Sequence, residues 1–139
     1  MKPVELPKSA AWGIAIPRIA VGIVFLMHGG QKLFVLGLPA IAGMFTKMGM
    51  PMPWPAAVLS TLTEFLGGLA YLIGWRTRLA SIPLAVNMAV AVFAVHFQGG
   101  FFAPRGFEYP FTLLAAHLGF LLMGSGALSI DALLNKRKS

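Results

Sequence analysis

The stretch AWGIAIPRIAVGIVFLM, residues 11–27, decides the fold. Its only charged side chain is that of Arg18, and its length approaches the ~20 mostly apolar residues that a helix needs to cross a bilayer. Such a run is typical of a membrane-spanning helix. A lone charge within hydrocarbon costs several kcal/mol, so we expect Arg18 to face other helices and to find a partner there.

Three more stretches of this kind follow along the chain. Together the four candidate spans cover residues 10–27, 56–75, 79–97 and 109–128. The whole chain is 58% hydrophobic and 11% charged, whereas a soluble domain carries about 25% charged residues. The sequence therefore predicts one all-α membrane domain over residues 1–139, a bundle of four transmembrane helices.

The long connection between the first two spans contains an apolar stripe. Ile41, Met44, Phe45 and Met48 recur at the i, i+3, i+4, i+7 spacing of one helix face. We expect a short amphipathic interfacial helix in this first outer loop. The local methionines could also suggest copper, because thioethers suit Cu(I). Two of them belong to the stripe, where methionine is ordinary packing, and we predict no metal site.

Basic residues are distributed unevenly between the two sides that four spans define. One side holds Lys2, Lys8, Arg76, Arg78, Lys136, Arg137 and Lys138, and the opposite side holds Lys32, Lys47 and Arg105. By the positive-inside rule, both termini are expected in the cytoplasm. This distribution accounts for the net charge of +7 without a nucleic-acid partner. The first span has no small-residue cleavage site and is expected to stay as an anchor.

The chain contains no cysteine. It therefore cannot run thiol–disulfide chemistry or hold a cysteine-ligated iron–sulfur cluster by itself. No flavin or haem signature is present either. Any redox role must depend on a bound cofactor or a partner protein.

Glu64 is the counterpart of Arg18, a single acidic residue inside the second span. Counted at ~1.5 Å per residue from the ends of their spans, the two lie at similar depths. We therefore predict a buried Arg18–Glu64 ion pair. It would serve either to fix the register of two helices or to form a polar wall for a ligand or a proton path.

Polar residues of the outer half form a candidate ligand pocket for a quinone, which needs an apolar slot and a few polar groups. The candidates are His28, Lys32, Tyr71, His96, Glu108 and His117. The alternative is that the histidines are satisfied in the core or at the interface, and that the charges are solvated. No metal-binding spacing such as HExxH connects the histidines.

Several segments resemble the DoxX family of small bacterial membrane proteins. They are FLMHGGQKLF (25–34) after the in-membrane arginine, GMPMP (49–53), TEFLGGLAYLIGWRTRLA (63–80), HFQGGFF (96–102), GFEYP (106–110) and GSGALSIDALL (124–134). The resemblance spans nearly the whole chain. It implies four transmembrane helices in the bacterial inner membrane. It also singles out Arg18, His28, Gly29, Lys32, Glu64, Gly68, His96 and Glu108.

The resemblance implies two functions. Some relatives are associated with quinone-linked sulfur oxidation, as a thiosulfate:quinone oxidoreductase subunit, and with membrane oxidoreductase complexes that handle oxidative stress. Related four-helix proteins act as assembly factors or chaperones. The leading hypothesis is an auxiliary subunit of a membrane redox system, possible partners being oxidoreductase subunits or further copies of the chain. The rival is a non-enzymatic assembly factor that binds a membrane protein or a lipid.

Overall fold

The computed structural model describes residues 7–136. Within that range every regular element is helical. In chain order the elements are α1 (Lys8–Gly30), η1 (Gln31–Leu36), α2 (Leu38–Lys47), α3 (Pro53–Ile73), α4 (Thr77–Val90), η2 (Ala91–His96), η3 (Phe97–Gly99), α5 (Glu108–Met123) and α6 (Ile130–Lys136). The segments η1 and η2 are π-helical continuations of α1 and α4. Lys2, Arg137 and Lys138, which contribute to the predicted charge asymmetry, lie outside the described residues.

The predicted helical membrane bundle is confirmed. Three continuous helices, Lys8–Leu36, Pro53–Ile73 and Thr77–Gly99, are long and apolar enough to cross a membrane. The fourth apolar helix, α5, has 16 residues and a length of about 24 Å. The chain ahead of α5 forms a loop, and Gly124 (φ 83°) ends the helix with a left-handed residue.

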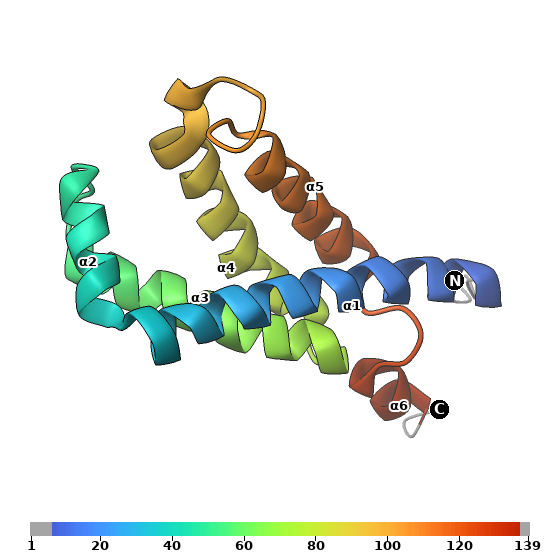
Figure 1. Cartoon of the computed structure of the whole chain (residues 1–139). Helices are drawn as coiled ribbons and strands as arrows, with labels where there is room; N and C mark the ends of the chain where they lie inside the picture. The colour runs from blue at the N-terminus through green and yellow to red at the C-terminus, as the bar shows by residue number, and fades with distance from the viewer. Residues whose placement is uncertain (1–6, 137–139) are drawn as a thin grey trace.

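The four long helices form two antiparallel pairs that diverge (Figure 1). One pair is α1 with α3, and the other is α4 with α5. The pairs meet at the end of the molecule that carries α6 and the start of α1, which we name the α6 end. They spread apart toward the opposite end, the α2 end, where α2 packs on α3. At the α2 end a cavity lies between the pairs, lined by residues of α1, α3, α4 and α5.

Glycines bring α1 and α3 into close contact. A Cβ atom added at Gly68 would overlap the backbone of Leu26, and one added at Gly29 would overlap the backbone of Phe65. Small residues let helix backbones approach in a membrane, where packing replaces the hydrophobic effect as the driving force. The α1–α3 pair is therefore closed along its length, in contrast to the space between α3 and α4.

The predicted amphipathic helix in the first connection is α2. Ile41 and Ala42 from its apolar face form a small buried cluster with Ala57 of α3, and Phe45 packs against it. Gly37 (φ 80°) allows the sharp change of direction that separates α2 from the end of η1. One face of α2 is thereby held against α3 beside the space between the helix pairs.

The predicted Arg18–Glu64 ion pair is wrong. The guanidinium of Arg18 donates hydrogen bonds to four backbone oxygens, those of Tyr71, Leu72 (3.3 Å), Ala127 (3.1 Å) and Leu128 (2.9 Å). Arg18 is fully buried. It thus bonds to two carbonyls in the last turn of α3, of which that of Leu72 has no other donor, and it ties this turn to the chain after α5.

The error lies in the register of α1 against α3. Helix α1 begins about ten residues before the level at which α3 ends, because Arg18 already contacts the last turn of α3. The depths of Arg18 and Glu64, counted from the ends of their own helices, therefore do not refer to the same level in the bundle. Glu64 lies two helical turns, about 10 Å, from Tyr71 along α3, and this is too far for a direct contact with Arg18.

Candidate ligand-binding site

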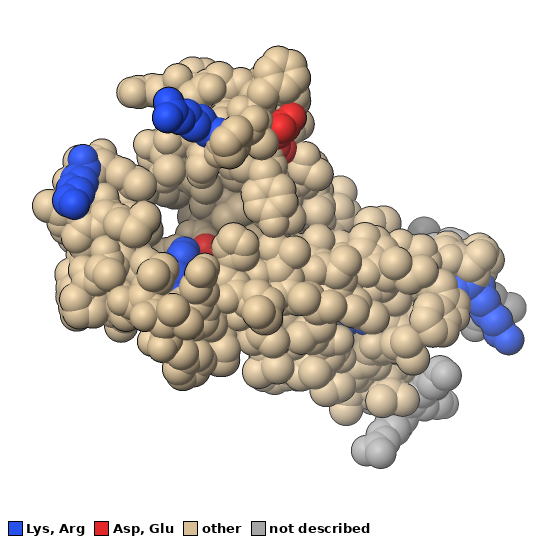
Figure 2. Space-filling model, in the orientation of Figure 1, with Lys and Arg blue, Asp and Glu red and all other residues tan. Residues whose placement is uncertain are grey.

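A cavity of about 760 Å³ occupies the space between the two helix pairs at the α2 end. Figure 2 shows it as a hollow with both blue and red atoms at its floor. Its charged lining residues are Lys32 and Glu64, and its walls are otherwise mainly apolar. The apolar lining comes from α1, α2, α4 and α5, and it includes Phe25, Ile41, Met44, Phe45, Met88 and Leu113. The volume lies in the range of small-molecule sites, about 300–1,000 Å³.

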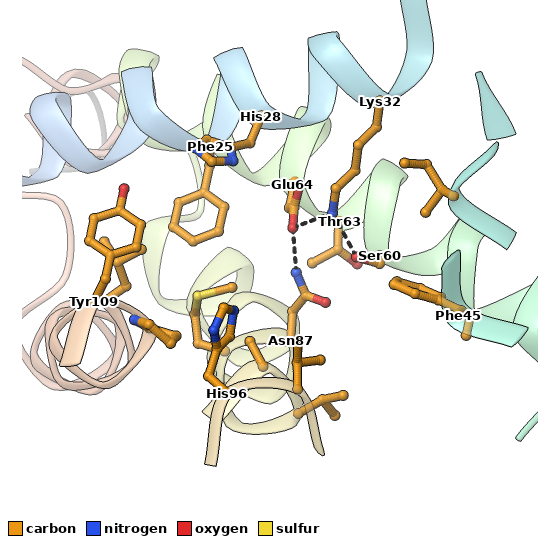
Figure 3. A pocket seen from close by; sticks show the side chains of 18 of the residues that line it. Phe25, His28, Lys32, Phe45, Ser60, Thr63, Glu64, Asn87, His96 and Tyr109 are labelled. Atoms are coloured by element: carbon orange, nitrogen blue, oxygen red, sulfur yellow. Dashed lines mark hydrogen bonds and ion pairs between the residues drawn. The ribbon is translucent and has the colours of Figure 1, made fainter. Parts of the chain in front are cut away.

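One polar cluster stands in the wall of this cavity. The ammonium of Lys32 donates to Glu64 Oε1 (2.8 Å) and to Ser60 Oγ (3.2 Å). The amide of Asn87 donates from Nδ2 to the same Glu64 Oε1 (2.9 Å). Figure 3 shows these side chains converging from η1, α3 and α4. We call Lys32, Ser60, Glu64 and Asn87 the polar cluster.

The local sequence explains this convergence. Ser60 and Glu64 are four residues apart and therefore share one face of α3. Lys32 reaches them because η1 continues α1 beyond Gly30 without a break. Asn87 lies in α4, beside the same face of α3, as the shared cavity lining shows. Three segments far apart in sequence thus supply one ion pair and its neutral neighbours.

Glu64 keeps unused acceptor capacity. Its residue exposure is 5%, and Oε2 has no hydrogen-bond partner among the residues that the structure describes. Leaving a buried acceptor unpaired is costly, and more so for a charged group. Lys32 contributes two N–H bonds to the cluster and has a third N–H. The cluster can therefore both donate to and accept from a bound molecule.

His28 and His96 also line the cavity. The Nδ1 atom of His96 lies 3.2 Å from the backbone oxygen of Arg105. A carbonyl oxygen only accepts, so Nδ1 carries the proton and Nε2 of the neutral ring is an acceptor. The structure thus places three of the predicted pocket residues, His28, Lys32 and His96, around one cavity.

Tyr71 and His117 do not line this cavity, contrary to the prediction. They form a fully buried hydrogen-bonded chain with Ser81, in which Tyr71 Oη lies 2.8 Å from His117 Nδ1 and 2.7 Å from Ser81 Oγ. Phe25, a lining residue, packs against the ring of His117 with centroids 4.9 Å apart. The chain therefore lies behind the apolar wall and links α3, α4 and α5.

The tautomer of His117 follows from this chain. Ser81 has one hydroxyl proton and must donate it to the backbone oxygen of Thr77 (2.7 Å), which only accepts. Tyr71 then donates to Ser81, and His117 donates from Nδ1 to Tyr71. The unpaired Nε2 of a neutral His117 is consequently the unprotonated nitrogen.

Glu108 is the third predicted pocket residue that does not line the cavity, after Tyr71 and His117. Its Oε1 accepts a hydrogen bond from the backbone nitrogen of Ala103 (2.7 Å), which closes the loop that leads into α5. Its neighbour Tyr109 lines the cavity instead. Among the described residues, no group of three or more His, Asp or Glu side chains is placed to hold a metal ion.

The pocket predicted from the sequence did not include Ser60 and Asn87, which line the cavity in the structure. Their sequence signals were present but weak, because Ser60 shares the face of Glu64 and Asn87 is an isolated amide in an apolar span. Asn87 and His96 both line the cavity, although a regular α-helix would separate them. At 100° per residue they fall on opposite faces, but residues 91–96 are π-helical, and the wider turns of a π-helix bring His96 round to the cavity side.

Comparisons with known proteins agree with this architecture. Residues 13–97 match the family model described as DoxX. The protein named "Putative oxidoreductase CatD" from Bacillus subtilis (strain 168) is 29% identical over 131 residues, covering 94% of this chain and 93% of the relative. "Uncharacterized membrane protein Rv3486" from Mycobacterium tuberculosis (strain ATCC 25618 / H37Rv) is 31% identical, covering 86% and 80%. "Inner membrane protein YphA" from Escherichia coli (strain K12) is 27% identical, covering 85% and 87%. No solved structure matches the chain.

Proposed function

The chain belongs to the DoxX family of membrane proteins, and from this premise we propose that it is an auxiliary subunit of a bacterial membrane redox system that binds a quinone in the cavity at the α2 end. The observation that carries the proposal is the cavity itself. It combines apolar walls with the polar cluster and a few further polar side chains, among them His28 and His96, and this is the arrangement that an amphiphile with a small polar ring requires.

The polar cluster would hold the head group. The remaining N–H of Lys32 can donate to a ring oxygen, and His28 and His96 lie on the same cavity. The isoprenoid tail would leave between the diverging helix pairs, past Phe25 and Leu113, toward lipid. In this proposal the site positions a quinone and another protein exchanges electrons with it, because a chain without cysteine has no thiol or cysteine-ligated cluster of its own to do so.

A partner supplying the electrons is therefore part of the proposal. The name of the Bacillus subtilis relative, an oxidoreductase, supports an association with redox enzymes. The proposed partners are oxidoreductase subunits or, alternatively, further copies of this chain. Two Escherichia coli relatives are named as inner membrane proteins. In that membrane, either kind of partner would contact this protein through its lipid-facing sides.

We also propose that both termini face the cytoplasm and that the cavity opens in the outer half of the membrane. The described ends of the chain lie at the same end of the molecule (Figure 1), as an even number of crossings requires. Lys8, Arg76 and Arg78 lie at that end, and positive charge is retained on the cytoplasmic side. A reporter fused after Ser139 that is active only in the cytoplasm would support this orientation.

Quinone binding can be tested on the purified protein. Native mass spectrometry after extraction in mild detergent should show a bound quinone, and added quinone should raise the melting temperature with the logarithm of its excess. Lys32→Gln should reduce this shift. Lys47→Gln removes a lysine from the same end of the molecule but outside the cavity, and should leave the shift unchanged.

Two results would contradict the proposal. One is a melting temperature that no quinone raises, together with purified protein that carries no quinone. The other is an equal loss of the shift in Lys32→Gln and Lys47→Gln, which would locate binding elsewhere. A co-purifying membrane protein without any quinone would favour the assembly-factor function.

A further inference from the structure

We infer that the cavity selects the reduced, hydroxyl-bearing form of its ligand, a quinol, over the quinone. The inference rests on the proposed function and adds the redox state of the bound ring. It follows from the hydrogen-bond capacity that remains unused in the polar cluster.

The first step concerns Glu64. Both donors that reach its carboxylate, Lys32 Nζ and Asn87 Nδ2, bond to Oε1, and Oε2 has no partner within residues 7–136. An unpaired carboxylate oxygen in an almost fully buried residue needs a donor. The terminal torsion of glutamate is soft, so a modest rotation offers an acceptor to a hydroxyl that enters the cavity.

The second step concerns the neighbouring donor. Lys32 uses two of its N–H groups within the cluster and keeps a third. A quinone carbonyl only accepts, so it could satisfy Lys32 but would place a partial negative charge beside the Glu64 carboxylate. A quinol hydroxyl both donates and accepts, so it can bond to Lys32 and to Glu64 at once.

The third step concerns the rest of the wall. Asn87 directs its Nδ2 to Glu64, which leaves Oδ1 as an acceptor. The Nδ1 atom of His96 donates to the backbone oxygen of Arg105, so the tautomer without a proton on Nε2 offers that nitrogen as another acceptor. The unused acceptors of the wall therefore also favour a head group that brings protons.

The test compares three probes of similar shape: an alkyl para-benzoquinone, the corresponding hydroquinone and the dimethyl ether of that hydroquinone. Affinities are measured by anaerobic calorimetric titration of the whole protein in phosphatidylcholine nanodiscs. The hydroquinone should bind about ten- to hundredfold more tightly than either other probe, which is the factor that a hydrogen bond to a charged acceptor gives.

The variant Glu64→Gln should change this preference. Its amide oxygen will face the two donors, Lys32 Nζ and Asn87 Nδ2, and its NH2 group will take the place of Oε2. A donor thus replaces the unpaired acceptor, and the hydroquinone preference should fall at least tenfold. The matched control Glu108→Gln makes the same substitution outside the cavity and should keep the preference of the wild type. The wild-type probe comparison decides the question by itself if Glu64→Gln does not fold.

A phospholipid ammonium group can also donate a hydrogen bond to Glu64, although it accepts none. Nanodiscs that contain phosphatidylethanolamine distinguish the two, because hydroquinone affinity should be the same with and without it. Competition by phosphatidylethanolamine would overturn the inference in favour of a lipid head group.

The remaining outcomes separate the inference from the function it rests on. A quinone that binds as tightly as the hydroquinone, or more tightly, overturns the quinol preference and leaves the quinone-binding function standing. Absence of binding by all three probes overturns both.

Discussion

The α6 end and the α2 end each bury a charge, and they treat it differently. Arg18 at the α6 end is fully buried, and its guanidinium is bonded to four backbone oxygens of its own chain. Glu64 at the α2 end pairs with Lys32 beside a cavity and keeps one oxygen without a partner among the described residues. The hydrogen bonds of Arg18 hold parts of the fold together, whereas Glu64 has an oxygen that could accept a bond from a ligand.

The difference shows why a buried charge in a membrane span does not by itself identify a functional site. What distinguishes the two is where the hydrogen bonds go. The backbone oxygen of Leu72 at the end of α3 has no other donor, so an arginine that bonds to it stabilises the fold. A carboxylate with spare capacity on a cavity wall leaves an acceptor unpaired, and in our proposal it is a ligand that uses it. We therefore expect substitutions at the two ends to affect different properties.

The largest expected effect is the loss of stability in Arg18→Met. It leaves the carbonyl oxygens of Leu72, Ala127 and Leu128 without their donor, whereas that of Tyr71 keeps the N–H of Gly74. At about 1–3 kcal/mol for each acceptor that stays buried, we expect a loss of at least about 3 kcal/mol. Arg18→Lys should recover only part, because one ammonium cannot reproduce the fork of a guanidinium. The measurement is the free energy of unfolding in detergent or bicelles.

The control for this comparison is Lys8→Met, which removes an exposed charge from the same helix and should be nearly neutral. If Arg18→Met is as stable as the wild type, Arg18 does not close the α6 end, and the contrast between the two ends fails.

The next effect concerns the closed α1–α3 interface. In Gly29→Ala the new Cβ would overlap the backbone of Phe65, and such overpacking costs about 1–3 kcal/mol. Gly13→Ala in the same helix has no neighbouring atom within 4 Å and should instead gain about 0.5–1 kcal/mol from helix propensity. Opposite signs in thermal unfolding would confirm the close approach. Equal effects would mean that α1 and α3 are not closely packed at Gly29.

The sequence predicted the elements well because single helices depend on local pattern. The apolar runs specified the long helices, and the stripe of Ile41 and Phe45 specified α2. Residues on one face of one helix were also predictable, and Glu64 was expected to face other helices, whereas Lys32 was a pocket candidate in the outer half with solvation as the alternative. The pairing between helices was not predictable, because it depends on how far α1 slides along α3. A shift of about three turns along α1 changed the partner of Glu64 from Arg18 to Lys32.

The candidate site shows the same limit. Lys32, His28 and His96 line one cavity. Tyr71 and His117 were expected beside them because they are polar and near the same depth, but they satisfy one another behind Phe25. A satisfied buried network and a ligand site contain the same residue types, so only three-dimensional partners separate them.

A third prediction uses double-mutant cycles to break or sharpen the contrast between Arg18 and Lys32. Lys32→Met and Glu64→Leu should show a coupling energy of about 0.5–3 kcal/mol, because the two side chains are in direct contact. Arg18→Met and Glu64→Leu should be additive within about 0.5 kcal/mol, as expected for separated sites. Strong coupling of Arg18 to Glu64 and none of Lys32 to Glu64 would reverse the assignment of partners.

The smallest expected effect tests whether Asp131 of α6 helps to close the α6 end. Burial alone would raise the pKa of Asp131, but hydrogen bonds from Ser125 and from the backbone nitrogens of Arg76 (2.9 Å) and Thr77 (3.3 Å), with the nearby charge of Arg18, lower it below its usual 3.8. A lowered folded-state pKa contributes stability above the unfolded-state pKa, and this contribution is lost as the pH falls through the folded-state value. The melting temperature of the wild type should therefore fall more steeply below about pH 4 than that of Asp131→Asn, which has no charge to lose. Because the group is partly exposed, the difference should be small and should shrink at high salt.

The contradicting outcome is a pair of parallel profiles of melting temperature against pH between about pH 2 and 6. It would show that the carboxylate of Asp131 does not hold α6 in place, and that Arg18 stabilises the α6 end without the help of Asp131.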